Sequence, residues 1–214
     1  MREAERLSEL IGRIYDAALD STLWVDVLGK TKNFIGGQGA ALGWKDAVAK
    51  RGEILYDNNG ISAYYRQLYF DKYIKLDPCT TGQFFAEVEE TIATADVIPY
   101  EEFFQTRFYK EWARPQGLVD GAMTVLEKSI TSAAFLGLFR NECQGAIDEE
   151  ARQRIRLLTP HFRRAVLIGK MIDLKTAEAA SLADTLDGIS AGMLLVDATG
   201  RIVHTNVEIG RAHV

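Results

Sequence analysis

The chain has 214 residues, of which 47% are hydrophobic and 26% are charged, a composition typical of a folded globular protein and unlike that of a disordered one. Its formal net charge of −5 argues against a nucleic-acid-binding surface in this part of the protein, because such surfaces are usually basic. The two cysteines, Cys79 and Cys143, argue against a disulfide scaffold or a structural zinc site.

The N-terminal segment carries charges from its second residue onward and lacks the apolar stretch of a signal peptide. No run in the sequence approaches the roughly 20 apolar residues that cross a bilayer. We therefore expect a cytoplasmic protein that does not enter a membrane.

Two helices are predicted at the start of the chain. Apolar residues recur at helical spacing within residues 1–20 and again within residues 21–35. Asp20 is expected to cap the second helix. Gly36 and Gly37 are expected to end it, because glycine tolerates the left-handed conformation at a helix terminus.

A hairpin and a third helix are predicted next. GAALGWKD (39–46) and RGEILYDNNG (51–60) read as two short strands, and the second ends in turn residues. A helix follows over residues 61–76. It is expected to end at Asp77, because Pro78 disfavours a helical conformation in the residue before it.

Short elements and a second hairpin are predicted in the following part of the chain. Residues 87–99 favour a short strand and a loop, and residues 100–118 favour one or two short helices rich in aromatic residues. Residues 118–129 and 131–142 read as the two strands of the second hairpin, the latter close to a continuous apolar run.

A long helix is predicted over residues 148–187, where apolar residues recur at alternating spacings of four and three. Pro160 predicts a kink or a restart, because proline removes a backbone hydrogen bond and clashes with the preceding turn. The apolar seam has two interpretations: it packs against a second copy of the chain in a homodimer, or it lies on the sheet of its own domain. The candidate dimerisation residues are Ile155, Leu158, Phe162, Ile172 and Leu186.

These elements together predict an α+β fold. Residues 1–147 are expected to form one domain, in which helices flank an antiparallel sheet. Residues 148–187 form a connecting helix, and residues 188–207 begin new β structure with strands at 193–196 and 201–204.

No constellation of catalytic residues is visible in the sequence. The histidines, His161, His204 and His213, lack the paired spacing of a metal site. The glycine-rich run GGQGAALG (36–43) has Leu42 where a dinucleotide-binding fingerprint requires glycine. Nothing assembles a nucleophile, a base and an orienting group. We therefore expect no enzyme activity, no metal and no cofactor.

Aromatic residues are dense between positions 44 and 112, and they suggest an apolar cavity between the sheet and the helices. For each aromatic residue taken alone, packing in the core is the simpler explanation. The group as a whole is suited to binding a small-molecule effector, because tyrosine and tryptophan add a polar tip to a large apolar surface. The candidate ligand-binding residues are Trp44, Tyr56, Tyr64, Tyr65, Tyr69, Tyr73, Asp77 and Trp112.

Three stretches resemble the N-terminal sensor region of LuxR-type transcriptional regulators: residues 98–126, 157–172 and 189–206. Such regulators pair a GAF- or PAS-like sensor with a C-terminal helix-turn-helix. The resemblance implies a GAF-like domain over residues 1–147. It also implies that DNA is bound only through a missing C-terminal domain, by a helix in the major groove.

The end of the chain predicts a truncated fragment. Residues 188–207 resemble the first strands of a PAS domain, which needs roughly a hundred residues to close its core. The last seven residues, EIGRAHV (208–214), match one reading frame of a widely used sequencing adapter. We expect them to be an adapter-derived tail without an evolved function.

A narrower resemblance is to the acyl-homoserine-lactone receptors of the same family. Their pocket helix carries a tryptophan, a tyrosine four residues later and then an Asp-Pro pair whose carboxylate takes the ligand amide. Asp77-Pro78 and Tyr73 match this pattern, whereas the tryptophan position falls on Tyr64 and the first tyrosine position on Leu68. A different small apolar or aromatic ligand, or none, fits the sequence as well.

Three functional hypotheses follow. The leading one is the sensory region of a one-component, DNA-binding transcriptional regulator. The second is the sensor of a histidine kinase or a cyclic-dinucleotide synthase, because GAF-like and PAS modules also precede these enzymes. The third is a dimerisation module that binds no ligand.

Overall fold

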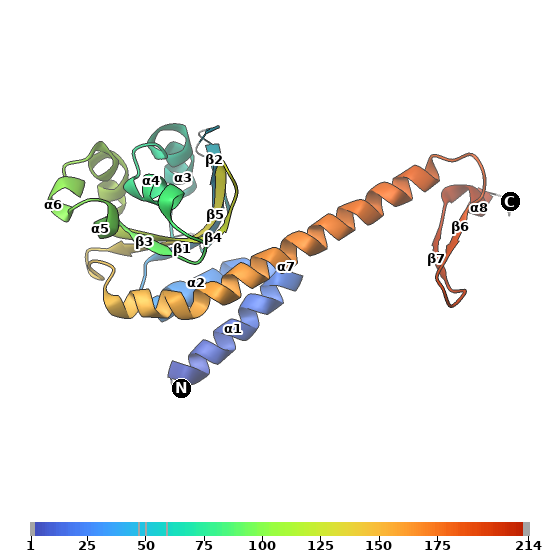
Figure 1. Ribbon diagram of the computed structural model, residues 1–214, viewed down its shortest axis with the longest axis horizontal. Helices are drawn as coiled ribbons and strands as arrows, with labels where there is room; N and C mark the ends of the chain where they lie inside the picture. Colours follow the sequence, from blue (N-terminus) through green and yellow to red (C-terminus); the bar gives the residue numbers. More distant parts are fainter. Residues whose placement is uncertain (1–2, 47, 50, 59, 212–214) are drawn as a thin grey trace. The chain divides into compact units, whose positions relative to one another are not determined.

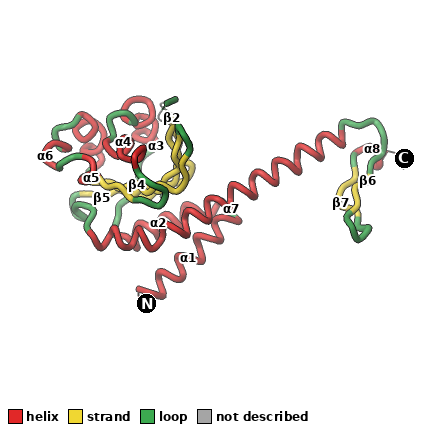
Figure 2. Tube along the Cα trace, in the orientation of Figure 1, coloured by secondary structure: helices red, strands yellow, loops and turns green. Residues whose placement is uncertain are grey.

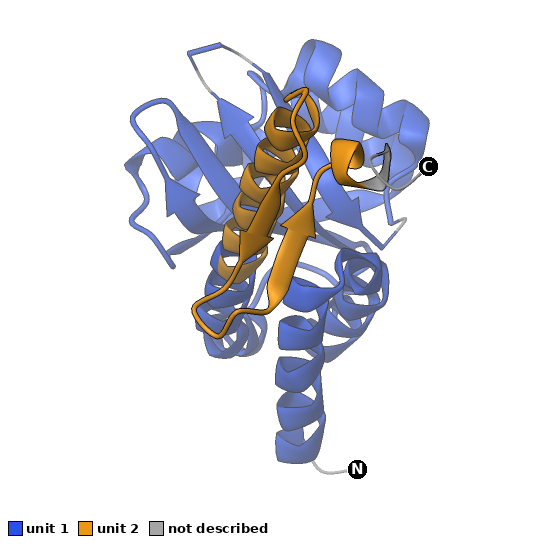
Figure 3. Ribbon diagram, turned by 90° about the vertical axis from the view of Figure 1, so that its right-hand side faces the viewer, with its two compact units in different colours: residues 1–167 blue, residues 168–214 orange. Residues whose placement is uncertain are grey.

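The computed structural model describes residues 3–46, 48–49, 51–58 and 60–211. The chain divides into two compact units, Met1–Leu167 (unit 1) and Ile168–Val214 (unit 2), which are coloured separately in Figure 3. All of the candidate ligand-binding residues belong to unit 1.

A five-stranded antiparallel sheet forms the centre of unit 1, with the strand order β2-β1-β5-β4-β3. Its strands are β1 Gly39–Asp46, β2 Arg51–Asp57, β3 Thr91–Ala93, β4 Leu118–Lys128 and β5 Ser132–Asn141. Both predicted hairpins are confirmed, since β1 pairs with β2 and β4 pairs with β5. The predicted α+β class is also confirmed.

Three helices lie on one side of this sheet, which we call the α1 face, and the outermost of them, α1, packs on α2 (Figure 1). They are α1 Glu3–Leu19, α2 Trp24–Ile35 and the first part of α7 Glu149–Asp187, with the 3-10 turn η1 Ser21–Leu23 between the first two. The Asp20 side chain accepts a hydrogen bond from the Thr22 backbone N–H at 3.0 Å, and Gly36 ends α2 with a φ of 85°. Asp20 thus caps the turn η1 that leads into α2, whereas α2 itself has no side-chain cap, and Gly36 ends α2 as expected.

Short helical segments cover the opposite face, the α3 face, and loops join most of them (Figure 2). They are α3 Ala63–Leu68, η2 Tyr69–Tyr73, α4 Pro78–Phe85, α5 Thr94–Val97, α6 Tyr100–Phe103, η3 Tyr109–Ala113 and η4 Arg114–Gln116. The helix expected over residues 61–76 is thus interrupted. It changes at Tyr69 into a π-helical turn, in which the Ile74 N–H donates to the Tyr69 carbonyl at 2.8 Å.

The long helix α7 is continuous over 39 residues, so the restart expected at Pro160 does not occur. Ile155, Leu158 and Phe162 flank this proline and are at most 1% exposed in the core on the α1 face. Their packing holds the helix together despite the missing hydrogen bond. These three residues pack within one chain, so their assignment to a dimer seam is wrong. The alternative, a helix lying on its own sheet, holds for this part of α7.

The boundary between the units therefore differs from the one expected at residue 147. The first turns of α7 belong to unit 1 because their apolar side chains complete its core. Of the remaining seam positions, Ile172 is 39% exposed and Leu186 is half-buried. Their role in dimerisation stays a prediction.

Unit 2 holds the rest of α7 and a two-stranded hairpin of β6 Leu194–Val196 and β7 Ile202–Thr205, followed by α8 Val207–Arg211. This confirms the expected pair of strands. Asn206 ties the hairpin to the end of α7, because its side chain accepts from the Met193 N–H at 2.8 Å and donates to the Leu186 carbonyl at 3.1 Å. Residues 212–214, the end of the expected adapter-derived tail, lie outside the described residues.

Candidate functional site

Two π-helical turns place aromatic side chains against the sheet on the α3 face. Tyr69 begins the turn η2, and Trp112 lies in the turn η3. Inserting a residue into a helix rotates the side chains that follow, and such turns are frequent at functional sites. The two rings are in contact, with centroids 5.2 Å apart, and both residues are buried.

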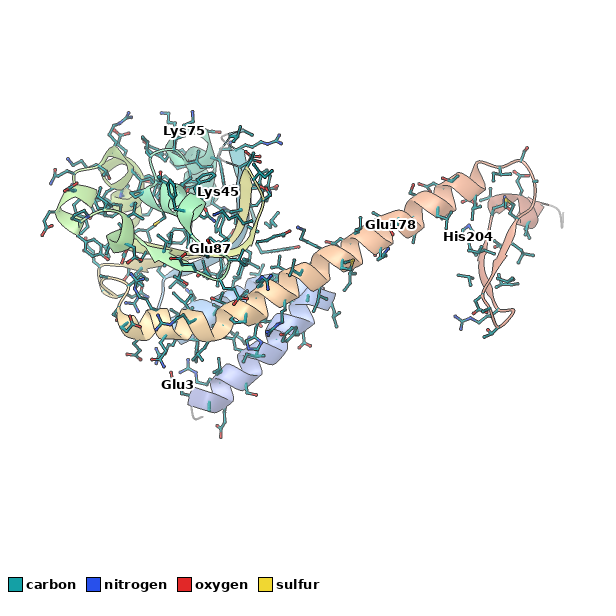
Figure 4. All side chains as sticks on the ribbon, in the orientation of Figure 1. Glu3, Lys45, Lys75, Glu87, Glu178 and His204 are labelled. Atoms are coloured by element: carbon teal, nitrogen blue, oxygen red, sulfur yellow. The ribbon has the colours of Figure 1, made fainter. Side chains whose placement is uncertain are left out.

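A buried charged network lies beside these rings. Lys45, on β1, is 4% exposed and lies in the interior of unit 1 (Figure 4). Its Nζ donates to Asp77 Oδ2 at 3.1 Å, to Thr80 Oγ1 at 2.8 Å and to the Tyr69 hydroxyl. The Tyr69 hydroxyl in turn donates to Asp77 Oδ2 at 2.6 Å. Lysine and aspartate are seldom this deeply buried unless they are paired, as they are here.

Asp77 accepts four hydrogen bonds within this network. Its Oδ2 accepts from Lys45, Tyr69 and Thr80, and its Oδ1 accepts from the Cys79 backbone N–H at 3.0 Å as the cap of α4. Three donors share Oδ2, whereas Oδ1 accepts only one. Asp77 is therefore also the N-cap of α4.

Burial shifts the titration of the groups in the network. Removal from water lowers the pKa of Lys45, and the opposite charge of Asp77 offsets part of this change. Burial also raises the pKa of Tyr69 well above its usual value, and the negative charge of Asp77 adds to the effect. Tyr69 is therefore a neutral hydrogen-bond donor to Asp77 throughout the physiological range.

The first cavity on the α3 face, cavity 1, has a volume of ≈ 40 Å³. The Lys45 stem and the Tyr69 ring form part of its wall. Gly60 lies against Gly39 at its edge, where an added Cβ would meet the Gly39 Cα at 2.7 Å. The remaining large side chains of its wall are Ile54, Ile61, Arg66, Phe70, Trp112, Met123, Phe135 and Phe139.

A second cavity, cavity 2, has a volume of ≈ 30 Å³ and lies beside the first. The two cavities share Trp112, Met123 and Phe139 as walls. Cavity 2 is lined in addition by the side chains of Asp77, Cys79, Thr94, Phe103, Phe108, Leu118 and Asp120.

Asp120 supplies the second buried carboxylate. It is 4% exposed, and its Oδ2 accepts from the Tyr100 hydroxyl at 2.5 Å and from the Ile147 backbone N–H at 2.7 Å. Its Oδ1 accepts from the Gly121 N–H at 2.7 Å. Burial and the hydrogen bond to Asp120 raise the pKa of Tyr100, so this tyrosine stays protonated as a donor.

The structure brings three of the sequence-derived candidates to the cavities, namely Tyr69, Trp112 and Asp77. Two other candidates, Tyr65 and Tyr73, lie next to these residues but do not line either cavity. Tyr65 contributes its backbone carbonyl, which accepts from Trp112 Nε1 at 2.8 Å. Tyr73 is buried beside the cavities, but its hydroxyl donates outward to Glu111 Oε2 at 2.8 Å.

The other three candidates line neither cavity, and their role in ligand binding stays a prediction. Tyr64 is 68% exposed, because the π-helical turn begins after it and leaves it on the outer side of α3. Tyr56 packs on the α1 face, 6.0 Å from the Trp24 ring. Trp44 is half-buried and lines an open groove beside the edge strand β2.

Sequence reasoning missed Lys45, Met123, Phe139 and Asp120. Alternate residues of a strand share one face, so Ala41, Gly43 and Lys45 lie together on one face of β1. Lys45 is therefore a single charge among small or apolar residues. That signal could have singled out Lys45. Asp120 had no comparable signal, because a bulge between Leu118 and Asp120 breaks the alternation of β4.

No protein-family model and no curated protein matches the sequence. Solved structures do match. The LBD domain of VqsR from Pseudomonas aeruginosa aligns with a TM-score of 0.63 at 15% identity, over 77% of this chain and 96% of that one. CepR2 from Burkholderia cenocepacia, an N-acylhomoserine-lactone-dependent LuxR-family transcription factor, aligns with a TM-score of 0.56 at 14% identity, over 78% of this chain and 96% of that one.

The chain shares its fold with both proteins. At these identities the likeness concerns the fold alone. No helix in the part of the chain that the structure describes is long and apolar enough to cross a membrane. Within the same residues, no three His, Cys, Asp or Glu side chains are grouped so that they could hold a metal ion.

Proposed function

We propose that unit 1 is the small-molecule sensor of a LuxR-type transcriptional regulator and has no enzyme activity of its own. The observation that carries the proposal is the pair of adjoining cavities on the α3 face, walled by aromatic rings and a few buried polar groups. The fold shared with the VqsR and CepR2 domains supports it.

The regulator would act in the cytoplasm as a homodimer, and a helix-turn-helix domain outside the given sequence would contact DNA. Ile172 and Leu186 are the seam positions that remain for the dimer, since neither is part of the core on the α1 face. They lie on the C-terminal part of α7, which leads away from unit 1 in the sequence.

Within unit 1, hydrogen bonds connect the wall of cavity 2 to the start of α7. Asp120 lines cavity 2 and accepts the N–H of Ile147, two residues before α7 begins. Arg140 holds the same turn from the neighbouring strand, because its guanidinium donates to Asp148 Oδ2 at 3.2 Å and to the Ala146 carbonyl. A ligand that moves the wall of cavity 2 would therefore shift the start of α7, and a packed helix passes on such a shift as a rigid element.

The ligand contact that the narrower resemblance implies for Asp77 is not part of this proposal. Its carboxylate already accepts four hydrogen bonds within the protein, three of them on Oδ2. The Tyr64 side chain, at the position of the family's tryptophan, is mostly exposed. The proposal therefore assigns neither residue to an acyl-homoserine lactone.

The test is a thermal-shift screen of the full chain against a metabolite panel, followed by a cavity-filling variant. Ala41 lines cavity 1 and is 5% exposed, so Ala41→Leu would fill the cavity. Ala17→Leu is the matched control, because it adds the same volume to the core on the α1 face, where Ala17 is 1% exposed. We expect at least one ligand whose stabilising shift disappears in Ala41→Leu and persists in Ala17→Leu. A panel without any ligand, or a ligand that binds both variants equally, contradicts the proposal.

A further inference from the structure

Cavity 2 is enclosed largely by aromatic rings. Phe108 and Trp112 stack with centroids 5.0 Å apart, and Phe103 lies 6.3 Å from Phe108. Phe139 lies 6.3 Å from Trp112 on the side shared with cavity 1. The faces of such rings carry negative partial charge and attract a cation within about 6 Å of the ring centroid.

The two carboxylates of this cavity differ in how their charge is balanced. Asp77 is paired with the buried Lys45 ammonium. Asp120, by contrast, forms no ion pair with any residue that the structure describes, and neutral donors alone hold it. Cavity 2 therefore has a net negative charge beside its aromatic walls.

Two arginines lie near Asp120, and the hydrogen bonds that they donate go to other groups. Arg140 faces Asp120 in the pairing of β4 with β5, but it donates to the turn before α7 and to the Gly36 carbonyl. Arg152 binds Asp96 with two hydrogen bonds of 2.8 and 3.0 Å. Arg152 acts on Asp120 through space, but no cation is bonded directly to this buried carboxylate, and a cationic ligand would offset the remaining cost of its burial.

Asp120 also has room for one more donor. Three hydrogen bonds occupy its two oxygens, two on Oδ2 and one on Oδ1. A carboxylate has about four lone-pair sites, so one site on Oδ1 remains. A ligand N–H can use this site without displacing the Ile147 N–H that leads into α7.

We propose that cavity 2 binds the ammonium group of a small primary amine, with Asp120 as its counter-ion and the rings of Phe103, Phe108 and Trp112 around it. This inference rests on the proposed sensor function and assigns it a ligand class. The apolar part of the amine extends past Met123 into cavity 1, whose wall is mostly aromatic and aliphatic but also includes Lys45 and Arg66. The ligand is thus an arylalkylamine or a similarly slender apolar amine.

The size of the cavities sets what must move on binding. Their volumes of ≈ 40 and ≈ 30 Å³ are well below the roughly 150 Å³ that accommodates a benzene ring in a protein core. Met123 borders both cavities, and its Sδ accepts from Lys45 Nζ at 3.2 Å. An unbranched methionine side chain changes rotamer readily to fit irregular space. Its displacement joins the two cavities into one elongated site.

The experiment compares three probes that share a phenyl ring and a two-carbon chain. They are 2-phenylethylamine, 2-phenylethanol and phenylacetate, which are cationic, neutral and anionic at neutral pH. Calorimetric titration of the full chain is expected to give at least about tenfold tighter binding of the amine than of the alcohol, the factor that corresponds to one charge-assisted hydrogen bond. No binding of phenylacetate is expected.

Two variants test the assigned residues. Asp120→Asn keeps the shape of the side chain and removes its charge, so it should weaken amine binding about tenfold and change alcohol binding less than about twofold. Phe103→Leu removes one aromatic face at similar volume and should weaken the amine several-fold. Asp71→Asn, which removes an exposed carboxylate on η2, is the control and should bind the amine as the unmodified chain does.

The outcomes separate this inference from the sensor proposal. If the alcohol or phenylacetate binds at least as tightly as the amine, the ligand class is wrong and the sensor function stands. If the amine binds and Asp120→Asn, still folded by circular dichroism, binds it equally well, the assigned counter-ion is wrong. If Asp120→Asn does not fold, Phe103→Leu decides in its place. If none of the probes binds at millimolar concentration, the inference is overturned, and the metabolite screen with Ala41→Leu still judges the sensor function.

Discussion

The two faces of the sheet in unit 1 are built differently. On the α1 face, α1, α2 and the start of α7 enclose a continuous apolar core, and its buried hydroxyls, Thr31 and Thr159, bond to carbonyls of their own helices. On the α3 face, short helical turns cover a charged network, a second buried carboxylate and two cavities.

This difference indicates that one face of the sheet stabilises the fold and the other carries the site. Close-packed apolar side chains contribute most of the stability of a fold, whereas buried charges and cavities subtract from it. Proteins keep such costly features where a function needs them. The α1 face therefore provides the stable platform, and the α3 face carries the site.

The largest expected effect lies on the α1 face. Phe162 is 0% exposed, and Phe162→Ala should lower the free energy of unfolding by about 3–5 kcal/mol, because it leaves a void that the helices around it fill only partly. Phe139 is half-buried and borders both cavities, so Phe139→Ala should cost only about 2 kcal/mol. Urea denaturation measures both values. Equal costs would contradict the contrast between the faces.

The charged network on the α3 face should show a different pattern. Asp77→Asn keeps the capping oxygen but leaves the Lys45 ammonium buried without a counter-charge, which should cost about 3 kcal/mol. In the double variant Lys45→Met with Asp77→Asn the charge is gone, and stability should return to within about 1 kcal/mol of the original. Equilibrium unfolding of the unmodified chain, of the single variants Asp77→Asn and Lys45→Met, and of the double variant gives the coupling energy. A double variant that loses as much stability as the two single variants together would contradict this expectation.

A smaller effect is expected for the two tryptophans. Trp112→Phe leaves the Tyr65 carbonyl without its indole donor and should cost about 1–2 kcal/mol. Trp24 packs between Tyr56 and Phe162 on the α1 face, so Trp24→Phe tests the loss of ring size alone. The same urea titration compares them, with Trp112→Phe expected to be the more costly. The reverse order would mean that the hydrogen bond to Tyr65 contributes little.

The smallest effect concerns acid stability at the rim of the α3 face. A hydrogen bond from Arg107 and a weaker effect of the one from Tyr73 lower the pKa of Glu111 from 4.5 to about 2. The folded state therefore holds this proton less tightly than the unfolded chain, so the stabilisation is present above pH 4.5 and is lost as pH falls toward 2. Melting temperatures of Glu111→Gln and the unmodified chain should differ near neutral pH and converge in acid. A constant difference across this range would exclude Glu111 as the titrating group.

Much of the fold could be predicted because its signals are local. The cap at Asp20, the stop at Gly36 and the turn chemistry of the hairpins each act within a few residues. The site was predicted only in part. Tyr69, Trp112 and Asp77 were among the candidates, yet their register depends on π-helical turns, which leave no recognisable pattern in a sequence.

By itself the sequence determined the α+β class, the two hairpins, the long helix and the aromatic density that suggested a cavity. Only the tertiary structure decided that Ile155, Leu158 and Phe162 face their own sheet, and that Lys45 meets Asp77 beside Trp112. The physical reason is that helical and strand propensities are properties of neighbouring residues. The partner of a buried side chain is chosen instead by how the whole sheet and its covering helices pack.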